Sequence, residues 1–325
     1  MSDQPLLHID DLHVHFNTSD GVVQAINGAS LTLNPGEIVG LVGESGSGKS
    51  VTAMSILGLV PKPPAIYPKG RILWKGIDLL TTPDRELREI RGGEISMIFQ
   101  DPMTSLNPVY TIGHQISEMI RVHERISAKA AKVRSIEMLD LVGVPNPQQR
   151  VDDYPHQFSG GMRQRAMIAM ALSCNPELLI ADEPTSAIDQ SAQAQLLGLF
   201  NDLIKKGLSI VLVSHDLGVI RYLSDYVYVM KDGIFVESGK SEEIFNNPKE
   251  VSNDKKYNED GKKYISKVME NEIKHLKGKK KLPYTSKKMK EKFDEQIELV
   301  KQFRIKNTMD INTDTDNINF IIKIL

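Results

Sequence analysis

Residues 43–50 constrain this chain more than any other segment, because they fit the phosphate-binding pattern GxxxxGK[ST] at every position. The segment is Gly43-Glu44-Ser45-Gly46-Ser47-Gly48-Lys49-Ser50. Residues 37–42 before it form an apolar run typical of a buried strand, and residues 51–59 after it favour a helix. A glycine-rich turn in this position lets backbone N–H groups and the positive end of the helix face phosphate oxygens. The segment therefore predicts a nucleoside triphosphate site.

Individual residues of this site have distinct predicted roles. Lys49 is expected to reach the β- and γ-phosphates, and the Ser50 hydroxyl is expected to bind Mg²⁺. Val51 opens the following helix and completes the predicted nucleotide-binding set. The alternative, a flexible glycine turn that contains a lysine by accident, is disfavoured because a strand and a helix flank the loop on the correct sides.

Two carboxylates follow a second apolar run, residues 178–181, and they supply the predicted chemistry. An acid at the end of such a strand can hold the shell of a Mg²⁺ ion, and its neighbour can polarise an attacking water. We assign Asp182 to the metal and Glu183 to the water. The competing interpretation is a pair of solvated carboxylates after a strand.

A third segment, Ser159-Gly160-Gly161, precedes the helical run 166–172. By itself it could be a helix cap with Ser159 at the first position. Placed about twenty residues before the carboxylates, it resembles the signature sequence Leu-Ser-Gly-Gly-Gln of ATP-binding cassette (ABC) ATPases. Phe158 and Met162 depart from that pattern, but the serine hydroxyl and both glycines remain. The resemblance implies that Ser159, Gly160 and Gly161 bind nucleotide.

The resemblance extends to four further positions in the family's order. It implies that Phe16 stacks on adenine; the alternative, which the alternation of residues 13–16 leaves open, is a core residue of a strand. Gln100 matches a contact to Mg²⁺ and water that also senses the membrane partner. Asp189, in Ser186-Ala187-Ile188-Asp189, matches the D-loop, and His215 matches the histidine that contacts the γ-phosphate. The implied catalytic residues are thus Glu183, His215 and Lys49.

Within this family, longer segments such as 99–108, 154–162 and 181–185 resemble the ATPase subunits of oligopeptide and dipeptide importers, the D-type subunit in particular. The resemblance covers residues 1 to about 248. It implies ATP and Mg²⁺ as cofactors, a second ABC ATPase subunit in a heterodimer, two transmembrane permease subunits and, indirectly, a solute-binding protein. The chain would then be a peripheral protein on the cytoplasmic face of the cell (inner) membrane.

Two other functions stay open at this point. Importers of nickel or another small solute share these motifs. A soluble ABC ATPase acting on nucleic acid or ribosomes is the more remote alternative, because the chain has no long coiled-coil insertion, no zinc-type cysteines and no second cassette. Residues 1–248 carry 21 Lys+Arg against 29 Asp+Glu, a net charge of −8 that gives no support for nucleic-acid binding.

Composition is consistent with a cytosolic location. The single cysteine, Cys174, cannot form an internal disulfide, which favours a reducing compartment. The N-terminus lacks the basic and apolar segments of a secretory signal. No apolar run approaches the ~18 residues that a membrane span requires.

Periodicity predicts an α/β fold with a mostly parallel core sheet, an antiparallel β layer and a helical subdomain. Residues 7–16 and 22–33 alternate like antiparallel strands, and residues 101–157 are expected to form the helical subdomain. We therefore predict an ABC ATPase domain over residues 1–248.

Residues 249–325 differ from the rest, with 19 Lys+Arg, 13 Asp+Glu, seven asparagines and no alanine. This atypical Lys/Asn-rich tail is expected to be partly helical. It also lacks the cysteine-rich stretch of the importer ATPases, and therefore the cysteines that would hold an iron–sulfur cluster in that region.

Overall fold

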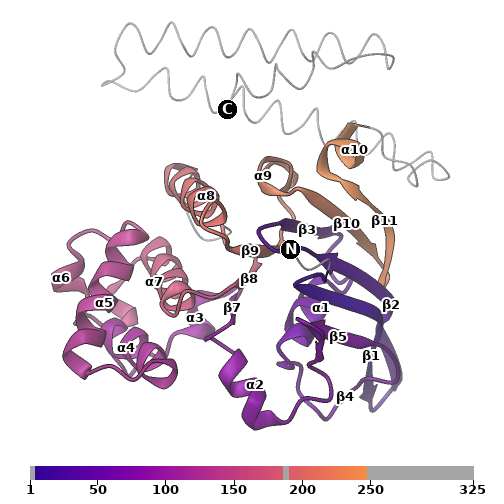
Figure 1. Cartoon of the computed structure of the whole chain (residues 1–325), viewed down its shortest axis with the longest axis horizontal. Helices are drawn as coiled ribbons and strands as arrows, with labels where there is room; N and C mark the ends of the chain where they lie inside the picture. The colour runs from indigo at the N-terminus through magenta and orange to yellow at the C-terminus, as the bar shows by residue number, and fades with distance from the viewer. Residues whose placement is uncertain (1–3, 186–189, 247–325) are drawn as a thin grey trace, which may run out of the picture. The chain divides into compact units, whose positions relative to one another are not determined.

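The computed structural model describes residues 4–185 and 190–246, and its centre is a six-stranded sheet (Figure 1). The sheet order is β11–β10–β3–β9–β8–β7. The strands are β3 (Ile38–Gly43), β7 (Ile95–Ile98), β8 (Leu178–Asp182), β9 (Ser209–Val213), β10 (Tyr226–Lys231) and β11 (Ile234–Lys240). Every neighbouring pair from β10 to β7 is parallel, and only β11 is antiparallel. All residues of β8 and β9 are buried, as expected for parallel strands that are covered on both faces.

A second sheet is antiparallel and confirms the predicted β layer. Its order is β2–β1–β5–β6, with β4 paired to β1. The strands are β1 (Leu7–Thr18), β2 (Gly21–Leu33), β4 (Ala65–Ile66), β5 (Arg71–Trp74) and β6 (Ile77–Asp78). The two long strands meet in a tight turn, where Thr18 pairs with Gly21. The short strands β4 and β6 were not predicted, because two residues carry no readable alternation.

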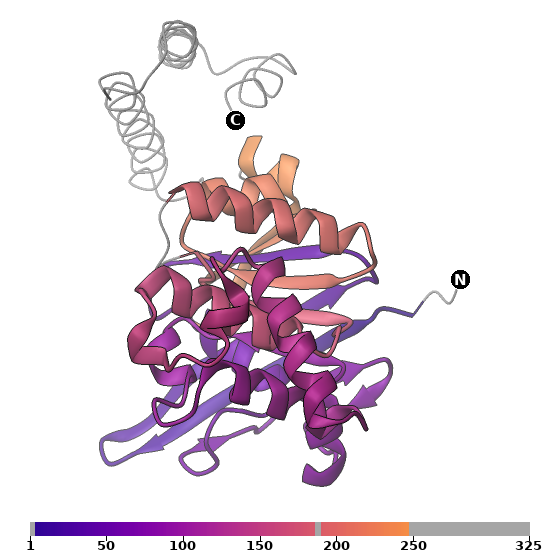
Figure 2. The ribbon, with the colours of Figure 1, turned by 90° about the vertical axis from the view of Figure 1, so that its left-hand side faces the viewer.

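Helices gather on one side of the core sheet and confirm the predicted helical subdomain (Figures 1 and 2). They are α3 (Pro102–Ser105), α4 (Ile112–His123), α5 (Ala128–Leu141), α6 (Pro147–Arg150), the 3₁₀ turn η1 (Pro155–Gln157) and α7 (Gly160–Leu172). Thr111 and Ser127 cap α4 and α5 through their side-chain oxygens. Gly143, with φ 74°, follows the end of α5.

The remaining helices lie between the strands along the chain or, for the last of them, after the final strand. They are α1 (Lys49–Ile56), α2 (Asp84–Ile90), α8 (Gln190–Ile204), α9 (Leu217–Leu223) and α10 (Ser241–Asn246). None of the helices within residues 4–185 and 190–246 has both the length and the apolar character to cross a membrane.

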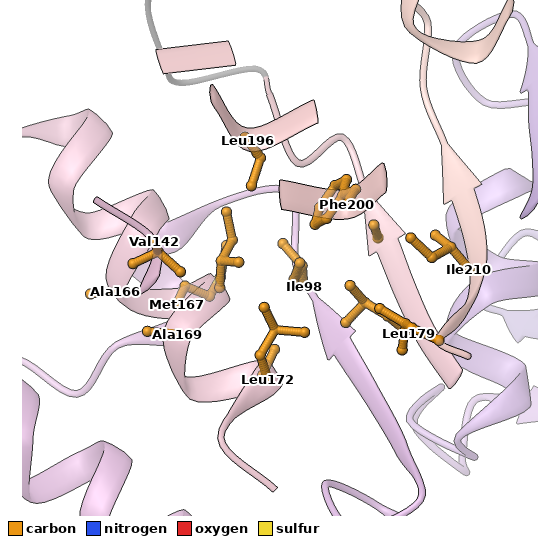
Figure 3. Close-up of a cluster of buried hydrophobic side chains, with 14 of the residues drawn as sticks. Ile98, Val142, Ala166, Met167, Ala169, Leu172, Leu179, Leu196, Phe200 and Ile210 are labelled. Atoms are coloured by element: carbon orange, nitrogen blue, oxygen red, sulfur yellow. The ribbon is translucent and has the colours of Figure 1, made fainter. Parts of the chain in front are cut away.

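The two faces of the core sheet belong to two different hydrophobic cores. On one face Leu179, Ile210 and Leu212 pack with the helical subdomain and α8, where Phe200 is fully buried (Figure 3). On the other face Val211 and Val213 pack with α1 and the antiparallel sheet. Successive residues of a strand point to opposite faces, so one apolar strand supplies both cores. The sheet is therefore held between the antiparallel layer and the helices.

Candidate nucleotide-binding and hydrolysis site

Strand register brings four of the sequence motifs to one edge of the core sheet. Leu41 of β3 and Asp182 of β8 both lie opposite Val213 of β9, and Ala181 lies opposite Ile98 of β7. Because these strands are parallel, the segments that follow them emerge at the same edge. The phosphate-binding loop, Gln100, the two carboxylates and His215 therefore converge, although more than 170 residues separate the first from the last.

The phosphate-binding loop needs its glycines for steric reasons. Gly43, Gly46 and Gly48 have φ of 153°, 81° and 110°, a region that L side chains rarely adopt. A Cβ on Gly43 would overlap the Met230 carbonyl, and one on Gly48 would lie 2.7 Å from Ile26 Cδ1. The loop is thus packed against the neighbouring strands, which fixes its curvature.

Lys49 lies inside this loop rather than in solvent. Its side chain is buried, and Nζ donates to the carbonyl oxygens of Gly43 at 2.9 Å and Glu44 at 2.8 Å. Burial lowers the pKa of Lys49, while the charges of Glu183 and Asp182 oppose that shift. Lys49 also begins α1, so the N–H groups of the helix's first turn, including those of Ser50 and Val51, have no intrahelical acceptor. The loop therefore presents several donors suited to phosphate.

Asp182 lies at the end of β8 and is only 5% exposed. Burial raises the pKa of this carboxyl, and a hydrogen bond from Ser50 partly offsets the shift. Among the described residues, its Oδ1 has no hydrogen-bond partner. A buried carboxylate oxygen without a partner, beside a serine hydroxyl, is a donor set that suits Mg²⁺, which is bound by one or two carboxylates plus phosphate oxygens. The described residues contain no cluster of three or more His, Cys, Asp or Glu side chains that could hold a metal by themselves, so phosphate oxygens and water would complete the shell.

Glu183 is held at both carboxylate oxygens. Gln100 Nε2 donates to Oε2 at 3.0 Å, and His215 Nδ1 lies 3.1 Å from Oε1. The Glu183 side chain is 17% exposed, whereas that of His215 is 68% exposed. The backbone of Glu183 has φ 49°, and its N–H donates to the Val213 carbonyl at 2.8 Å. The structure thus brings Gln100, Glu183 and His215 together in the grouping that the resemblance implied.

Ser159 lies at the N-terminus of α7, in the helical subdomain. Its side-chain oxygen accepts from the Met162 N–H at 3.3 Å, so it caps the helix. Ser159 and Gly160 are exposed, and Gly161 is half-buried. Figure 1 shows α7 and α1 in separate parts of the fold. The signature segment therefore lies away from the phosphate-binding loop of its own chain.

Of the remaining predicted site residues, Phe16 lies outside this grouping and Asp189 is not among the described residues. Phe16 lies in β1, half-buried against the core of the antiparallel sheet, and pairs with Val23 and Ala65. The same hairpin reaches the phosphate-binding loop through Ala25 and Ile26, which lie against Gly48. Asp189 and the rest of 186–189 lie outside the described residues, so its role stays a prediction.

Sequence reasoning missed Gln164, which is fully buried in α7 and donates to the Pro184 carbonyl at 2.9 Å. The available signal was a polar residue between Arg163 and the apolar run that begins at Ala166. A buried amide needs a hydrogen-bond partner, but the sequence does not show which one.

Comparisons with known proteins agree with this geometry. A family profile described as "ABC transporter" matches residues 26–186. The oligopeptide transport ATP-binding protein OppD of Bacillus subtilis (strain 168) is 53% identical over 245 residues, which cover 75% of this chain and 68% of OppD. The dipeptide transport ATP-binding protein DppD of the same strain is 51% identical over 246 residues, 75% of this chain and 73% of DppD.

A solved structure, the dimeric post-hydrolysis state of the ATP-binding cassette MJ0796 bound to ADP and Pi, has a TM-score of 0.67 and 27% identity. The match covers 72% of this chain and 98% of that one. The 53% and 51% identity to OppD and DppD over most of their length, together with the fold shared with MJ0796, shows that the chain belongs to the ATP-binding subunits of ABC transporters.

Proposed function

We propose that this chain hydrolyses ATP to power a membrane importer of di- and oligopeptides. The observation that carries the hydrolytic part is the grouping of Gln100, Glu183 and His215 beside the phosphate-binding loop. The peptide cargo is supported by relatives whose names specify oligopeptide and dipeptide transport. Nickel or another small solute is the alternative cargo.

Nucleotide binding would fall to the loop and its flanks. Lys49 and the N–H groups of residues 43–51 would hold the phosphates, and Phe16 would stack on the adenine. Ser50 and Asp182 would hold Mg²⁺, with Gln100 as a further contact. When bound, the ion would neutralise part of the charge on the β- and γ-phosphates.

Glu183 would orient the attacking water and accept its proton. Proton transfer needs a base within hydrogen-bond reach and in a fixed orientation. Gln100 and His215 supply that orientation, since each contacts one oxygen of the carboxylate. His215, whose side chain is 68% exposed, would also contact the γ-phosphate.

The site would be completed by a second ATPase subunit. Ser159, Gly160 and Gly161 are displayed away from their own phosphate-binding loop, so they are available to the γ-phosphate held by another subunit. Asp189 would lie at the same junction. The structural relative MJ0796 is a dimer in its post-hydrolysis state with ADP and Pi bound, which supports a dimeric arrangement. For this chain we propose a heterodimer, bound beneath two transmembrane permeases at the cytoplasmic face of the membrane and served by a solute-binding protein.

The test is phosphate release by the full complex in lipid vesicles, with the solute-binding protein added alone or loaded. We expect loading with a mixed di- and oligopeptide pool to raise the rate, whereas Ni²⁺ should not. Stimulation by Ni²⁺ alone would replace the peptide cargo with the nickel alternative. A rate that responds to DNA or ribosomes and ignores the permeases would overturn the transporter function.

A further inference from the structure

Gln164 is a buried amide whose hydrogen bonding is incomplete among the described residues. It is fully buried, and Nε2 donates to the Pro184 carbonyl at 2.9 Å. Its Oε1 has no partner in the part of the chain that the structure describes. Buried amides are normally satisfied on both sides, because an unpaired polar atom costs stability. An apolar side chain of similar size would fill the same space without that cost, so the hydrogen bond to Pro184 is the feature that requires an explanation.

The bond joins two functional segments of the chain. Pro184 directly follows Glu183, whose backbone has φ 49° and is fixed to Val213 of β9. At the other end, Gln164 is five positions after Ser159 on α7, a rise of about 7.5 Å along the helix axis. Helix α7 thus carries the signature serine at its N-terminus, and Gln164 in its second helical turn is hydrogen-bonded to the backbone next to Glu183.

The neighbouring residue attaches the same helix to α8. The Arg165 guanidinium donates to the Gly143 carbonyl and, through Nη2 at 3.1 Å, to Gln195 Oε1. Figure 3 shows Met167 of α7 among the side chains that lie between this helix, β8 and α8. Close-packed contacts of this kind transmit small displacements. A shift of α7 would therefore move both the Pro184 turn before residues 186–189 and the helix after them.

We propose that Gln164 is a positioning residue that couples the signature helix to Glu183 of the same chain. The inference rests on the proposed ATPase function. When Ser159 engages a nucleotide on the second subunit, the Gln164–Pro184 hydrogen bond keeps the Glu183 turn in register with α7. The coupling acts on hydrolysis and leaves nucleotide binding unchanged, because neither Gln164 nor Pro184 belongs to the phosphate-binding loop.

The experiment compares wild type with Gln164→Met, in the full chain and within the complex that hydrolyses ATP. We expect kcat to fall by about 3- to 10-fold, the effect of one hydrogen bond, while KM for ATP stays within about twofold. The matched control is Gln115→Met in α4, a buried amide that donates to Asn107 and Tyr110. It should lower the melting temperature but leave kcat per folded molecule unchanged.

A second variant covers the case in which Gln164→Met does not fold. In Gln164→Glu the carboxyl can donate to the Pro184 carbonyl only when it is protonated, so its kcat relative to wild type should fall as the pH is raised. A kcat for Gln164→Met equal to wild type, or a pH-independent ratio for Gln164→Glu, would overturn the inference while leaving the ATPase function intact. A wild-type complex that releases no phosphate would overturn the proposed function, and this inference with it.

Discussion

Two regions of the proposed site differ in how completely their side chains are engaged. The first, called the catalytic edge for its proposed role, is the edge of the core sheet that carries Lys49, Gln100, Asp182, Glu183 and His215, and the second is the signature segment, residues 159–161 at the start of α7. At the catalytic edge, Glu183 is held by Gln100 and His215, and Lys49 is held by two carbonyl oxygens of its own loop. At the signature segment, Ser159 and Gly160 are exposed. Within the described residues, the one hydrogen bond of the Ser159 side chain is to the Met162 N–H in the first turn of its own helix.

The difference separates a part of the site that folding completes from a part that assembly completes. Parallel strands place the catalytic edge automatically, because their carboxyl ends share one side of the sheet. No such constraint positions Ser159 near its own phosphate-binding loop, since the helical subdomain carries it elsewhere (Figure 1). We infer that the chemistry belongs to one chain and that its activation depends on a second.

The largest effect is expected from a substitution at the catalytic edge. Glu183→Gln keeps the shape of the side chain but removes the base, so ATP hydrolysis should fall by on the order of 10² to 10⁴, while ATP binding persists and a closed dimer accumulates. Phosphate release and nucleotide binding are measured in parallel. The matched control is Glu177→Gln, just before the opposite end of β8, which loses only an exposed ion pair to Lys75 and should behave as wild type. Near-normal turnover of Glu183→Gln would show that Glu183 is not the base in hydrolysis.

A smaller effect is expected at the signature segment, where two roles of Ser159 can be separated. Ser159→Ala removes both the helix cap and the hydroxyl offered to the second subunit, so it should lose about 1 kcal/mol of stability and about tenfold in turnover, the effect of one hydrogen bond. Ser159→Asn keeps a capping oxygen and should retain stability but not turnover. Thermal melting and phosphate release distinguish the roles. If Ser159→Asn keeps full activity, the serine is a cap and nothing more.

Asp182 sharpens the comparison through stability rather than rate. Burial raises the pKa of Asp182, so the folded protein loses stability as the pH rises above the unfolded value of about 3.9, and the loss is complete once the pH exceeds the raised value in the folded state. Asp182→Asn removes the buried charge and should raise the melting temperature by about 2–4 °C in EDTA, equivalent to about 1 kcal/mol. With ATP present, the substitution should also abolish the further rise in melting temperature that Mg²⁺ gives the wild-type protein. A lower melting temperature in EDTA would contradict the assignment of Oδ1 to a cation.

The smallest effect is expected from removing the Lys/Asn-rich tail. All the nucleotide-binding motifs end by His215, so a chain that stops at Pro248 should fold and bind ATP with Mg²⁺ with an affinity within about twofold of the full chain. Nucleotide binding and thermal melting measure this. Precipitation, or loss of nucleotide binding, would mean that the tail belongs to the core fold and that the proposed boundary is wrong.

The sequence predicts the catalytic edge better than it predicts the contacts around it. A phosphate-binding loop between a strand and a helix, and carboxylates after an apolar strand, follow local rules of periodicity and spacing. These rules correctly indicate the parallel core, the antiparallel hairpin and the helical subdomain. They do not indicate α2 or α9, each of seven residues and close to the length at which helical periodicity can no longer be recognised.

Contacts between distant residues were beyond reach for a different reason. The bond from Gln164 to Pro184 spans 20 positions, and that from Gln100 to Glu183 spans 83. Such pairs depend on strand order and helix packing, which no single segment specifies. Motif resemblance assigned Gln100 and Glu183 to the same water but did not predict the bond between them, and Gln164 lies outside the motif roles; both contacts became visible only in the fold.

The most direct test of the central claim is the rate of phosphate release by this chain alone and with its partners. If assembly completes the site, the purified chain hydrolyses ATP slowly, and the rate per chain rises when the partner ATPase and the permeases are added in lipid. With the same partners, Ser159→Ala should not show the rise. A rate per chain that is already maximal in isolation, and that stays constant on dilution and on addition of the partners, would contradict the account.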